Sequence, residues 1–362
     1  MTNENPTYPM TDQQVRRRLF WLLQRLSSYS LWRRKRDAWA LFAEKFEAAL
    51  KTWPEESTQG FHPKCIIWIY DALRLYDEGL PELAVGNRQV WQRITGEFHQ
   101  LFRPVDLVSK FFYPRCHERW TQVEAYPPEV ETLNKLRITA EYRGDNLLYP
   151  PHNNVSNIIY ADHLLDPKEY TWEFQTEPYP VFPKNLPPVP EHSDIIIKTD
   201  EPVPCDGIWE PVKLRYQRKF LLIPTEISGF TCLGAFNYFI RGMNAPRQVY
   251  HDDLLCDGFG YRDVHWRLVW QDTRYCDGVI PDESDYFLHD APGKRITART
   301  GDPSPHSGRW GTLVAGATGY AQVNQGQKMP EFHDIAGQPH QTLWSLLERD
   351  DQGSVYIKQE DG

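Results

Sequence analysis

Apolar residues recur at helical spacing over residues 11–145. The first stripe consists of Val15, Leu19, Leu22 and Leu26. Spacings of four, three and four positions place such a stripe on one face of a helix, with Asp12 or Thr11 as its N-cap. Similar series cover residues 32–50, residues 66–76 up to Gly79, and residues 90–101 up to Pro104. The short connections between them predict a helical bundle.

From Ile195 onward the apolar runs become short. Strands are predicted at residues 195–197, 219–223, 264–270 and 343–347, separated by Gly, Pro and Asp-Gly turn signals. Residues 165–194 carry seven prolines among Tyr, Trp and Phe. This density of proline favours extended chain, and the aromatic residues indicate a connector that packs on a domain.

The two patterns together predict an α+β protein, with an N-terminal helical bundle followed by a mostly β region built from two related repeats. The expected segments are a disordered tail (1–10), a helical domain (11–145), a Pro- and aromatic-rich connector (146–194), β repeat 1 with an insertion (195–290), β repeat 2 (291–350) and a tail (351–362).

The repeat rests on a T-x-x-P-x-P-x-x-G-x-W frame that occurs at residues 199–209 and, without a gap, at residues 300–310. Its framework residues are Pro202, Pro204, Gly207 and Trp209 in the first copy, and Pro303, Pro305, Gly308 and Trp310 in the second. A repeated frame predicts a repeated supersecondary unit. The frame contains no shared nucleophile, acid or metal ligand, which favours a protein that presents a surface.

The first copy is longer than the second. Gly207 and Gly242 lie 35 positions apart, whereas Gly308 and the matching Gly326 lie 18 apart. The difference predicts an insertion near residues 211–237, which is where we expect a function specific to the first copy.

The formal charge of -9 is unevenly distributed. Residues 11–51 hold ten Lys and Arg against four Asp and Glu, and residues 250–290 hold three Arg against ten Asp and Glu. A net acidic chain with an acidic tract is a poor nucleic-acid binder, because phosphate contacts need cations. The acidic tract instead suits a basic protein partner.

Several features predict a cytoplasmic protein. No run of about 18 apolar residues, the length that a membrane helix needs, occurs in the chain. The first residues lack the basic and apolar regions of a secretory signal. Six cysteines without a C-x-x-C pair suit a reducing compartment. We therefore expect no membrane association.

Candidate metal and cofactor sites are weak. Cys-Asp-Gly occurs at residues 205–207, 256–258 and 276–278, which suggests either a zinc thiolate cluster or three turns preceded by small buried cysteines. Zinc ligands usually come in close pairs, so turns are favoured and no metal ligand is assigned. No phosphate-binding, nucleophile-elbow or dinucleotide motif is present, so no cofactor and no catalytic residue are assigned.

Charged clusters allow two interpretations each. The acidic residues at 252–253 and 282–285 are either solvated loops or a surface for a basic partner, and these two hypotheses stand level. The basic clusters at residues 16–18 and 33–36 predict solvated helix faces, which could also pair with the acidic half, inside the protein or in a dimer. Trp209 and Trp310 are sheet anchors or, alternatively, platforms for a sugar or a base.

The chain resembles a bacterial immunity-protein family in several segments. These are residues 181–190, Pro202-x-Pro-x-x-Gly-Ile-Trp-Glu-Pro211, residues 238–246, Pro305-x-Ser-Gly-Arg-Trp310 and residues 325–330, with residues 20–29 similar to the family's opening helix. It looks like the immunity proteins of polymorphic toxin and type VI secretion systems, in families 71 and 72. The resemblance implies a non-enzymatic protein that binds and blocks one cognate toxin.

The resemblance supplies no contact residues, so those expected rest on charge and on the insertion. The candidate toxin-binding residues are Asp252, Asp253, Asp257, Asp282, Glu283, Asp285, Tyr238 and Phe239. Two other functions stay open at this point: an enzyme that reverses toxin damage, and a carbohydrate- or peptide-binding β module on a helical adaptor. A homodimer is also left open.

Overall fold

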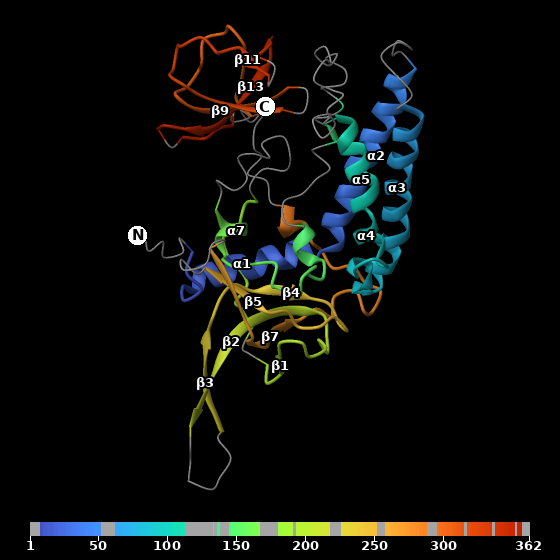
Figure 1. Cartoon of the computed structure of the whole chain (residues 1–362), viewed down its shortest axis with the longest axis vertical. Coiled ribbons are helices and arrows are strands. Elements are labelled where there is room, and N and C mark those ends of the chain that lie inside the picture. The colour runs from blue at the N-terminus through green and yellow to red at the C-terminus, as the bar shows by residue number, and fades with distance from the viewer. Residues whose placement is uncertain are drawn as a thin grey trace.

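The protein combines N-terminal helices with antiparallel sheets, so the predicted α+β class is confirmed (Figure 1). The computed structural model describes residues 8–51, 62–112, 133, 136–137, 145–166, 180–190, 193–217, 226–251, 258–287, 295–314, 317–334, 337–351 and 353–356. No described helix is long and apolar enough to cross a bilayer.

The helical part begins where the apolar stripe predicted. The helices and helical turns are α1 (Gln13–Leu26), α2 (Tyr29–Leu50), α3 (His62–Ala84), η2 (Arg88–Trp91), α4 (Glu97–Gln100), α5 (Phe102–Phe112), η5 (Asp145–Leu148) and α7 (Asp162–Leu165). Asp12 caps α1 by accepting a hydrogen bond from the backbone N–H of Gln14 at 2.7 Å. Ser28 caps α2 in the same way through the N–H of Leu31.

Two helix boundaries were predicted wrongly. The helix that was expected to close at Gly79 continues to Ala84. A Cβ on Gly79 would lie 2.6 Å from the Phe98 ring, so this glycine allows close packing of α4 rather than ending α3. The stripe over residues 90–101 is not one helix, because Ile94 adopts a positive φ between η2 and α4. Pro104 lies in the first turn of α5, where its missing N–H costs no helical hydrogen bond.

The first β unit, residues 193–287, carries the larger sheet. Its elements are β1 (Ile196–Lys198), β2 (Gly207–Gln217), β3 (Glu226–Cys232), β4 (Asn237–Phe239), β5 (Gln248–His251), β6 (Phe259–Arg262), β7 (His265–Gln271) and η7 (Ser284–Phe287). The sheet has the order β1-β7-β2-β3, with β4 also paired to β2, and β5–β6 form a separate ribbon. The strands predicted at 195–197 and 264–270 are present, and the one at 219–223 lies outside the described residues.

The second β unit, residues 295–356, has a smaller sheet of order β10-β9-β13-β8. Its strands are β8 (Thr297–Arg299), β9 (Gly308–Val314), β10 (Ala317–Val323), β11 (Phe332–His333), β12 (Pro339–His340) and β13 (Leu343–Arg349). The strand predicted at 343–347 is thus present. Trp310 and Trp344 lie at the centre of a hydrophobic core that belongs to this unit.

The frame glycines make the same backbone approach in both units. A Cβ on Gly207 would lie 2.1 Å from the carbonyl oxygen of Trp270, and a Cβ on Gly308 would lie 2.1 Å from that of Glu348. Only glycine fits where one strand crosses so close to another. Each glycine therefore allows the first residue of its central strand, β2 or β9, to lie against the backbone of the neighbouring strand.

Other contacts match between the units as well. Trp266 donates its indole N–H to the carbonyl of Pro246 at 2.7 Å, and Trp344 donates to that of Pro330 at 2.9 Å. Trp266 stands opposite Ile197 across β7 and β1, as Trp344 stands opposite Ala298 across β13 and β8. Such matched contacts are what a duplication would leave, and the duplication itself stays a prediction.

The helices and the first β unit share one hydrophobic core, whereas the second unit has its own. Figure 1 shows α1 lying across the first sheet, and the ring of Phe20 meets the edge of Trp270 at 5.9 Å. The described parts of the connector also pack here. Phe182 contacts Trp21 with ring centroids 5.2 Å apart, and Leu165 is buried in the shared core.

Candidate functional site

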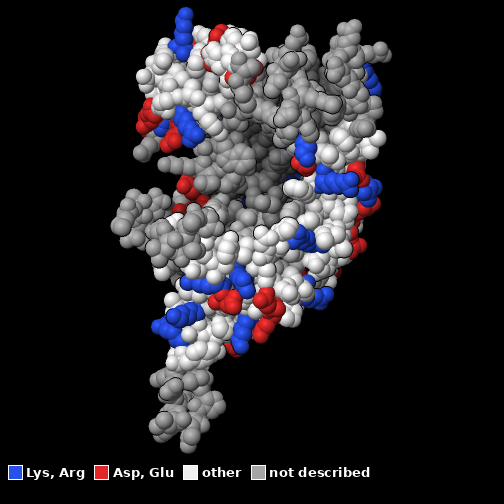
Figure 2. All heavy atoms as spheres, in the orientation of Figure 1, with Lys and Arg blue, Asp and Glu red and all other residues white. Residues whose placement is uncertain are grey.

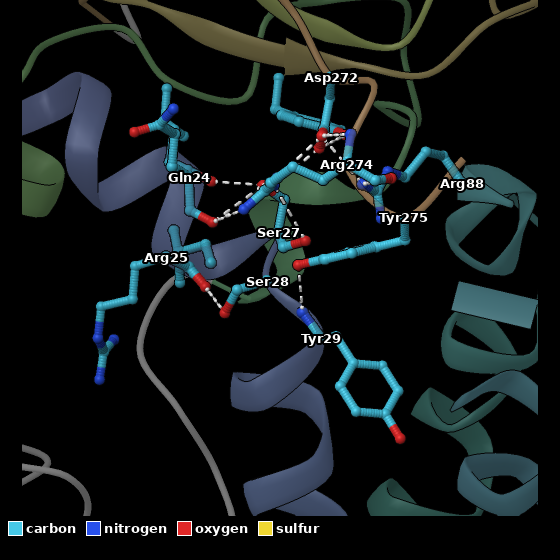
Figure 3. Close-up of polar contacts among 12 residues, drawn as sticks. Gln24, Arg25, Ser27, Ser28, Tyr29, Arg88, Asp272, Arg274 and Tyr275 are labelled. Atoms are coloured by element: carbon cyan, nitrogen blue, oxygen red, sulfur yellow. Dashed lines mark hydrogen bonds and ion pairs between the residues drawn. The ribbon is translucent and has the colours of Figure 1, made fainter. Parts of the chain in front are cut away.

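The most concentrated polar chemistry lies at the junction of the helices and the first sheet (Figure 3). Asp272, which follows β7, receives Arg88 Nη2 at 2.9 Å on one oxygen and Arg274 Nη2 at 2.7 Å on the other. Tyr238 donates its hydroxyl to the same carboxylate at 2.8 Å. The side chains of Arg88 and Asp272 are 0% exposed. Complete burial of a charged pair requires this density of donors.

Arg274 carries the network into the turn between α1 and α2. Its guanidinium donates to the carbonyl of Gln24 at 2.9 Å and to the Oγ of Ser27 at 2.7 Å. The carbonyls that end a helix have no intrahelical partner, and a cation near them is favoured by the helix dipole. Arg274 therefore satisfies the end of α1 and the carboxylate of Asp272 together.

Tyr275 and Glu283 satisfy the start of α2. The Tyr275 hydroxyl accepts a hydrogen bond from the backbone N–H of Tyr29 at 2.9 Å and donates to Glu283 Oε1. The other oxygen of Glu283 accepts from the N–H of Ser30 at 2.8 Å. An anion at a helix N-terminus is stabilised by the free N–H groups and by the dipole. We call Arg88, Asp272, Arg274, Tyr275 and Glu283 the interface cluster.

The electrostatics of the interface cluster are those of a structural ion network. Burial by itself raises the pKa of Asp272, but the charge and hydrogen bonds of Arg274 and the charge of Arg88 outweigh it and lower that pKa to about 2. Burial raises the pKa of the Tyr275 hydroxyl. At neutral pH the carboxylate of Asp272 is therefore ionised and the phenol neutral, and neither group is poised to exchange a proton.

A second buried ion network joins α1 to the sheet directly. Arg16 Nη1 lies 2.5 Å from Glu210 Oε1, and Arg267 Nη2 lies 2.6 Å from Glu210 Oε2. Burial raises the pKa of Glu210, but its two arginine partners outweigh this and lower it. The interpretation of residues 16–18 as a wholly solvated face is wrong for Arg16, because this residue pairs with the β half inside the protein.

The expected toxin-binding residues fall into three groups. Tyr238 and Phe239 are buried in β4, where Phe239 packs edge-on against Trp266 at 4.7 Å. Glu283 is buried in the interface cluster, which corrects the solvated-loop interpretation at that position. Asp282 and Asp285 are exposed. Asp252, Asp253 and Asp257 lie outside the described residues, and toxin contact by any member of the set stays a prediction.

The structure also bears on the hypotheses about the Cys-Asp-Gly segments and about Trp209 and Trp310. Cys276 is exposed and Cys205 is half-buried, so neither is the fully buried cysteine that was expected before a turn, and Cys256 lies outside the described residues. Among the described residues, no group of three His, Cys, Asp or Glu side chains could hold a metal ion. Trp209 and Trp310 are fully buried. They are sheet anchors, and the hypothesis of a sugar or base platform is wrong for both.

An open cleft of about 400 Å³ lies beside the C-terminal half of α3. Its lining residues are Glu78, Glu82, Asn87, Gln89, Thr95 and Glu97. Glu78 already pairs with Arg74 on its own helix at 2.7 Å, and Glu82 accepts from the amide of Asn87 at 2.9 Å. These contacts explain two of the three carboxylates as local surface structure.

A match to a known family falls on the segment that contains the first β unit. Residues 188–288 match the family model described as Immunity protein 72. The match supports assignment to an immunity protein family and agrees with the resemblance to family 72, whereas that to family 71 stays a prediction. No curated protein and no solved structure matches the chain.

The Immunity protein 72 segment includes all strands from β1 to β7 and ends just after η7. It therefore contains Asp272, Arg274, Tyr275 and Glu283, which the sequence did not single out as a network. Their helical partners lie far away in the chain: 186 positions separate Arg88 from Arg274. The dense charge of residues 250–290 was the available signal, but it could not show which of its acids are buried.

Proposed function

We propose that this chain is an immunity protein that binds its cognate antibacterial toxin and neutralises it by forming a stoichiometric complex. The observation that carries the proposal is the match of residues 188–288 to Immunity protein 72, which implies a toxin as partner. The toxin is the C-terminal domain of a secreted effector, of the polymorphic or type VI class. The cytoplasm as the site of action stays a prediction.

Inhibition by binding is favoured over catalysis because immunity proteins generally act by binding. The residues of the interface cluster include those with strongly shifted pKa values, and their polar groups bind the end of α1 and the start of α2 to the sheet. Asp272 has both oxygens occupied by arginines, and Glu283 has both occupied by donors from α2 and Tyr275. Perturbed groups indicate catalysis only where a reacting atom can approach them.

Titration of toxin activity against the purified chain tests the proposal. A tight complex predicts that activity falls linearly and ends at one immunity protein per toxin. A chain that reverses toxin damage would instead protect at a small fraction of the toxin concentration, and this result would contradict the proposal. Co-expression with active toxin in a sensitive bacterium supplies the matching survival assay.

The exposed acids Asp282 and Asp285 stay a proposed contact for a basic patch on the toxin. Reversal of both charges to Lys is expected to weaken binding and to reduce its salt dependence, because rim charges act on the association rate. Unchanged binding at low and high salt would remove this surface from the proposal without affecting the immunity function.

A further inference from the structure

The hairpin formed by β2 and β3 continues well beyond the body of the first β unit. Its outer part, residues 213–217 and 226–231, is called the hairpin arm. Figure 1 shows it leaving the sheet on the side away from α2 and α3, and in Figure 2 the described surface becomes narrower toward it. A projecting two-stranded ribbon has few neighbours of its own and gains little stability alone.

The second β unit indicates that the fold does not need this arm. The central strand β9 has 7 residues and ends at Val314, whereas its counterpart β2 has 11 and extends to Gln217; β3 and β10 have 7 residues each. The short version keeps the close glycine approach and the buried tryptophans of the frame. The extra length of β2 therefore has a purpose outside the packing of the unit.

One face of the arm is an apolar ladder that begins in the core. Across β2 and β3 the paired residues are Val212 with Cys232, Leu214 with Phe230, and Tyr216 with Ile227. Paired residues of antiparallel strands point to the same face. Val212 is 0% exposed, but Tyr216 is 55% and Ile227 46% exposed. The ladder thus continues past the point where the protein covers it.

The arm is held in shape by contacts between its strands. The register shifts between Arg215 and Tyr216, so that Ser228 is the extra residue of a bulge in β3. The Arg215 guanidinium lies over Gly229 and donates to the carbonyl of Phe230 at 3.1 Å. The Ser228 hydroxyl returns a bond to the carbonyl of Arg215 at 3.2 Å. Bulges sharpen strand twist and re-aim side chains, here those of Tyr216 and Ile227.

The other face of the arm is polar and cationic. Lys213 and Arg215 alternate with the ladder residues and are exposed. The arm holds these two cations against a single Glu, in a chain of net charge -9. Lys213 and Arg215 lie on β2 beyond Val212, the last residue of β2 that pairs with β7. Cations protect such a strand edge from unwanted pairing, and they also attract an acidic partner.

We propose that the hairpin arm is the element that enters the toxin, in a cleft with one apolar wall and one acidic wall. The apolar wall covers Tyr216 and Ile227, and the acidic wall faces Lys213 and Arg215. An aromatic anchor next to an arginine is a frequent centre of binding energy in interfaces. This inference rests on the proposed function and names the surface that performs it.

The test compares two matched double variants of the full chain. Tyr216→Ser with Ile227→Thr removes the exposed end of the ladder. Tyr320→Ser with Leu343→Thr removes two apolar side chains of similar exposure, 43% and 40%, from the second unit. The probe is the toxin domain that co-purifies with the wild-type chain, prepared separately in a catalytically inactive form.

We expect the arm variant to bind this domain about 30-fold more weakly, mainly through faster dissociation, as loss of a binding hot spot predicts. The Tyr320/Leu343 variant should stay within about twofold of wild type, since its side chains lie outside the arm. Lys213→Glu should slow association and flatten the dependence of affinity on salt, because it removes attraction to the acidic wall.

The outcomes separate this inference from the proposed function. If no toxin domain co-purifies with the wild-type chain, both are overturned. Wild-type affinity in the arm variant would overturn the arm inference and leave the immunity function standing. A wild-type dimer in sedimentation that dissociates in the arm variant would also overturn it, because the ladder would then cover a second copy of this chain.

Discussion

Arg274 donates a hydrogen bond to the Oγ of Ser27 at 2.7 Å, although the two residues are 247 positions apart in the chain. The guanidinium also holds Asp272, so the end of α1 and the end of β7 are joined through one side chain. This contact joins the helices to the first sheet beside the hydrophobic core that they share, and the stability of the protein should depend on it.

Asp272→Asn tests the interface cluster. The variant leaves Arg88 buried without its counter-charge and removes the nearer of the two carboxylates beside Arg274, which typically costs about 3–5 kcal/mol. We expect a decrease of this order in the free energy of unfolding at pH 7, measured by urea denaturation. Asp285→Asn, at an exposed position, should change it by less than about 0.5 kcal/mol.

The loss of unfolding free energy in Asp272→Asn should also depend on pH, in a direction that the pKa of Asp272 fixes. The folded-state pKa of Asp272 is lowered from 3.8 to about 2, so its contribution is complete above pH 3.8 and is lost as pH falls toward 2. The shift corresponds to about 2 kcal/mol. The difference in unfolding free energy between wild type and Asp272→Asn should therefore shrink by that amount between pH 5 and pH 2, as urea titrations at each pH would record. A constant difference would contradict the assignment.

Arg16→Met tests the second ion network. Glu210 is nearly fully buried and would lose one of its two arginine partners, so we expect a loss of about 3 kcal/mol of unfolding free energy in denaturant titrations. Arg33→Met is the matched control, because Arg33 is exposed on the neighbouring helix. Equal effects of the two changes would show that Glu210 does not depend on Arg16.

Gly207→Ala and Gly308→Ala test the strand approaches in the two units. A methyl group 2.1 Å from a carbonyl oxygen forces the strands apart, and we expect a cost of about 2–3 kcal/mol. Gly301→Ala, where φ is also positive but nothing lies within 4 Å, should cost about 1 kcal/mol. Hydrogen exchange localises the damage: faster exchange in β2 and β7 for the first change, and in β9 and β13 for the second.

Thiol labelling tests burial in the helical part. Cys65 is buried, and burial raises its pKa to about 12, so it should not react with a thiol reagent at pH 8 until the protein unfolds. Cys276 is exposed and should label at once. Mass spectrometry of the labelled peptides distinguishes the two. Rapid labelling of Cys65 in the native protein would show that α3 opens locally.

Much of the secondary structure could be predicted because it depends on neighbours in sequence. The stripe from Val15 to Leu26 and the cap at Asp12 are local patterns, and α1 begins where they predict. Gly79 misled the same reasoning. Its role is to admit the ring of Phe98 from α4, and a contact between two helices leaves no periodic signal in either.

The candidate surfaces show a similar division. The difference in glycine spacing between the two copies predicted an insertion near residues 211–237, and the hairpin arm lies within this range. Among the expected contact residues, Tyr238 and Glu283 are buried. The sequence could not show this burial, because an aromatic or acidic residue is the same letter whether its side chain faces solvent or the protein interior.

The sequence by itself determined the α+β class, the repeated frame with its two glycine and tryptophan positions, and the resemblance to an immunity family, since these depend on composition and on local order. Only the tertiary structure decided which charges are buried and which apolar residues are left open. Arg88 and Asp272 become a pair, and Tyr216 and Ile227 an uncovered ladder, because folding brings distant segments together and leaves one hairpin beyond their reach.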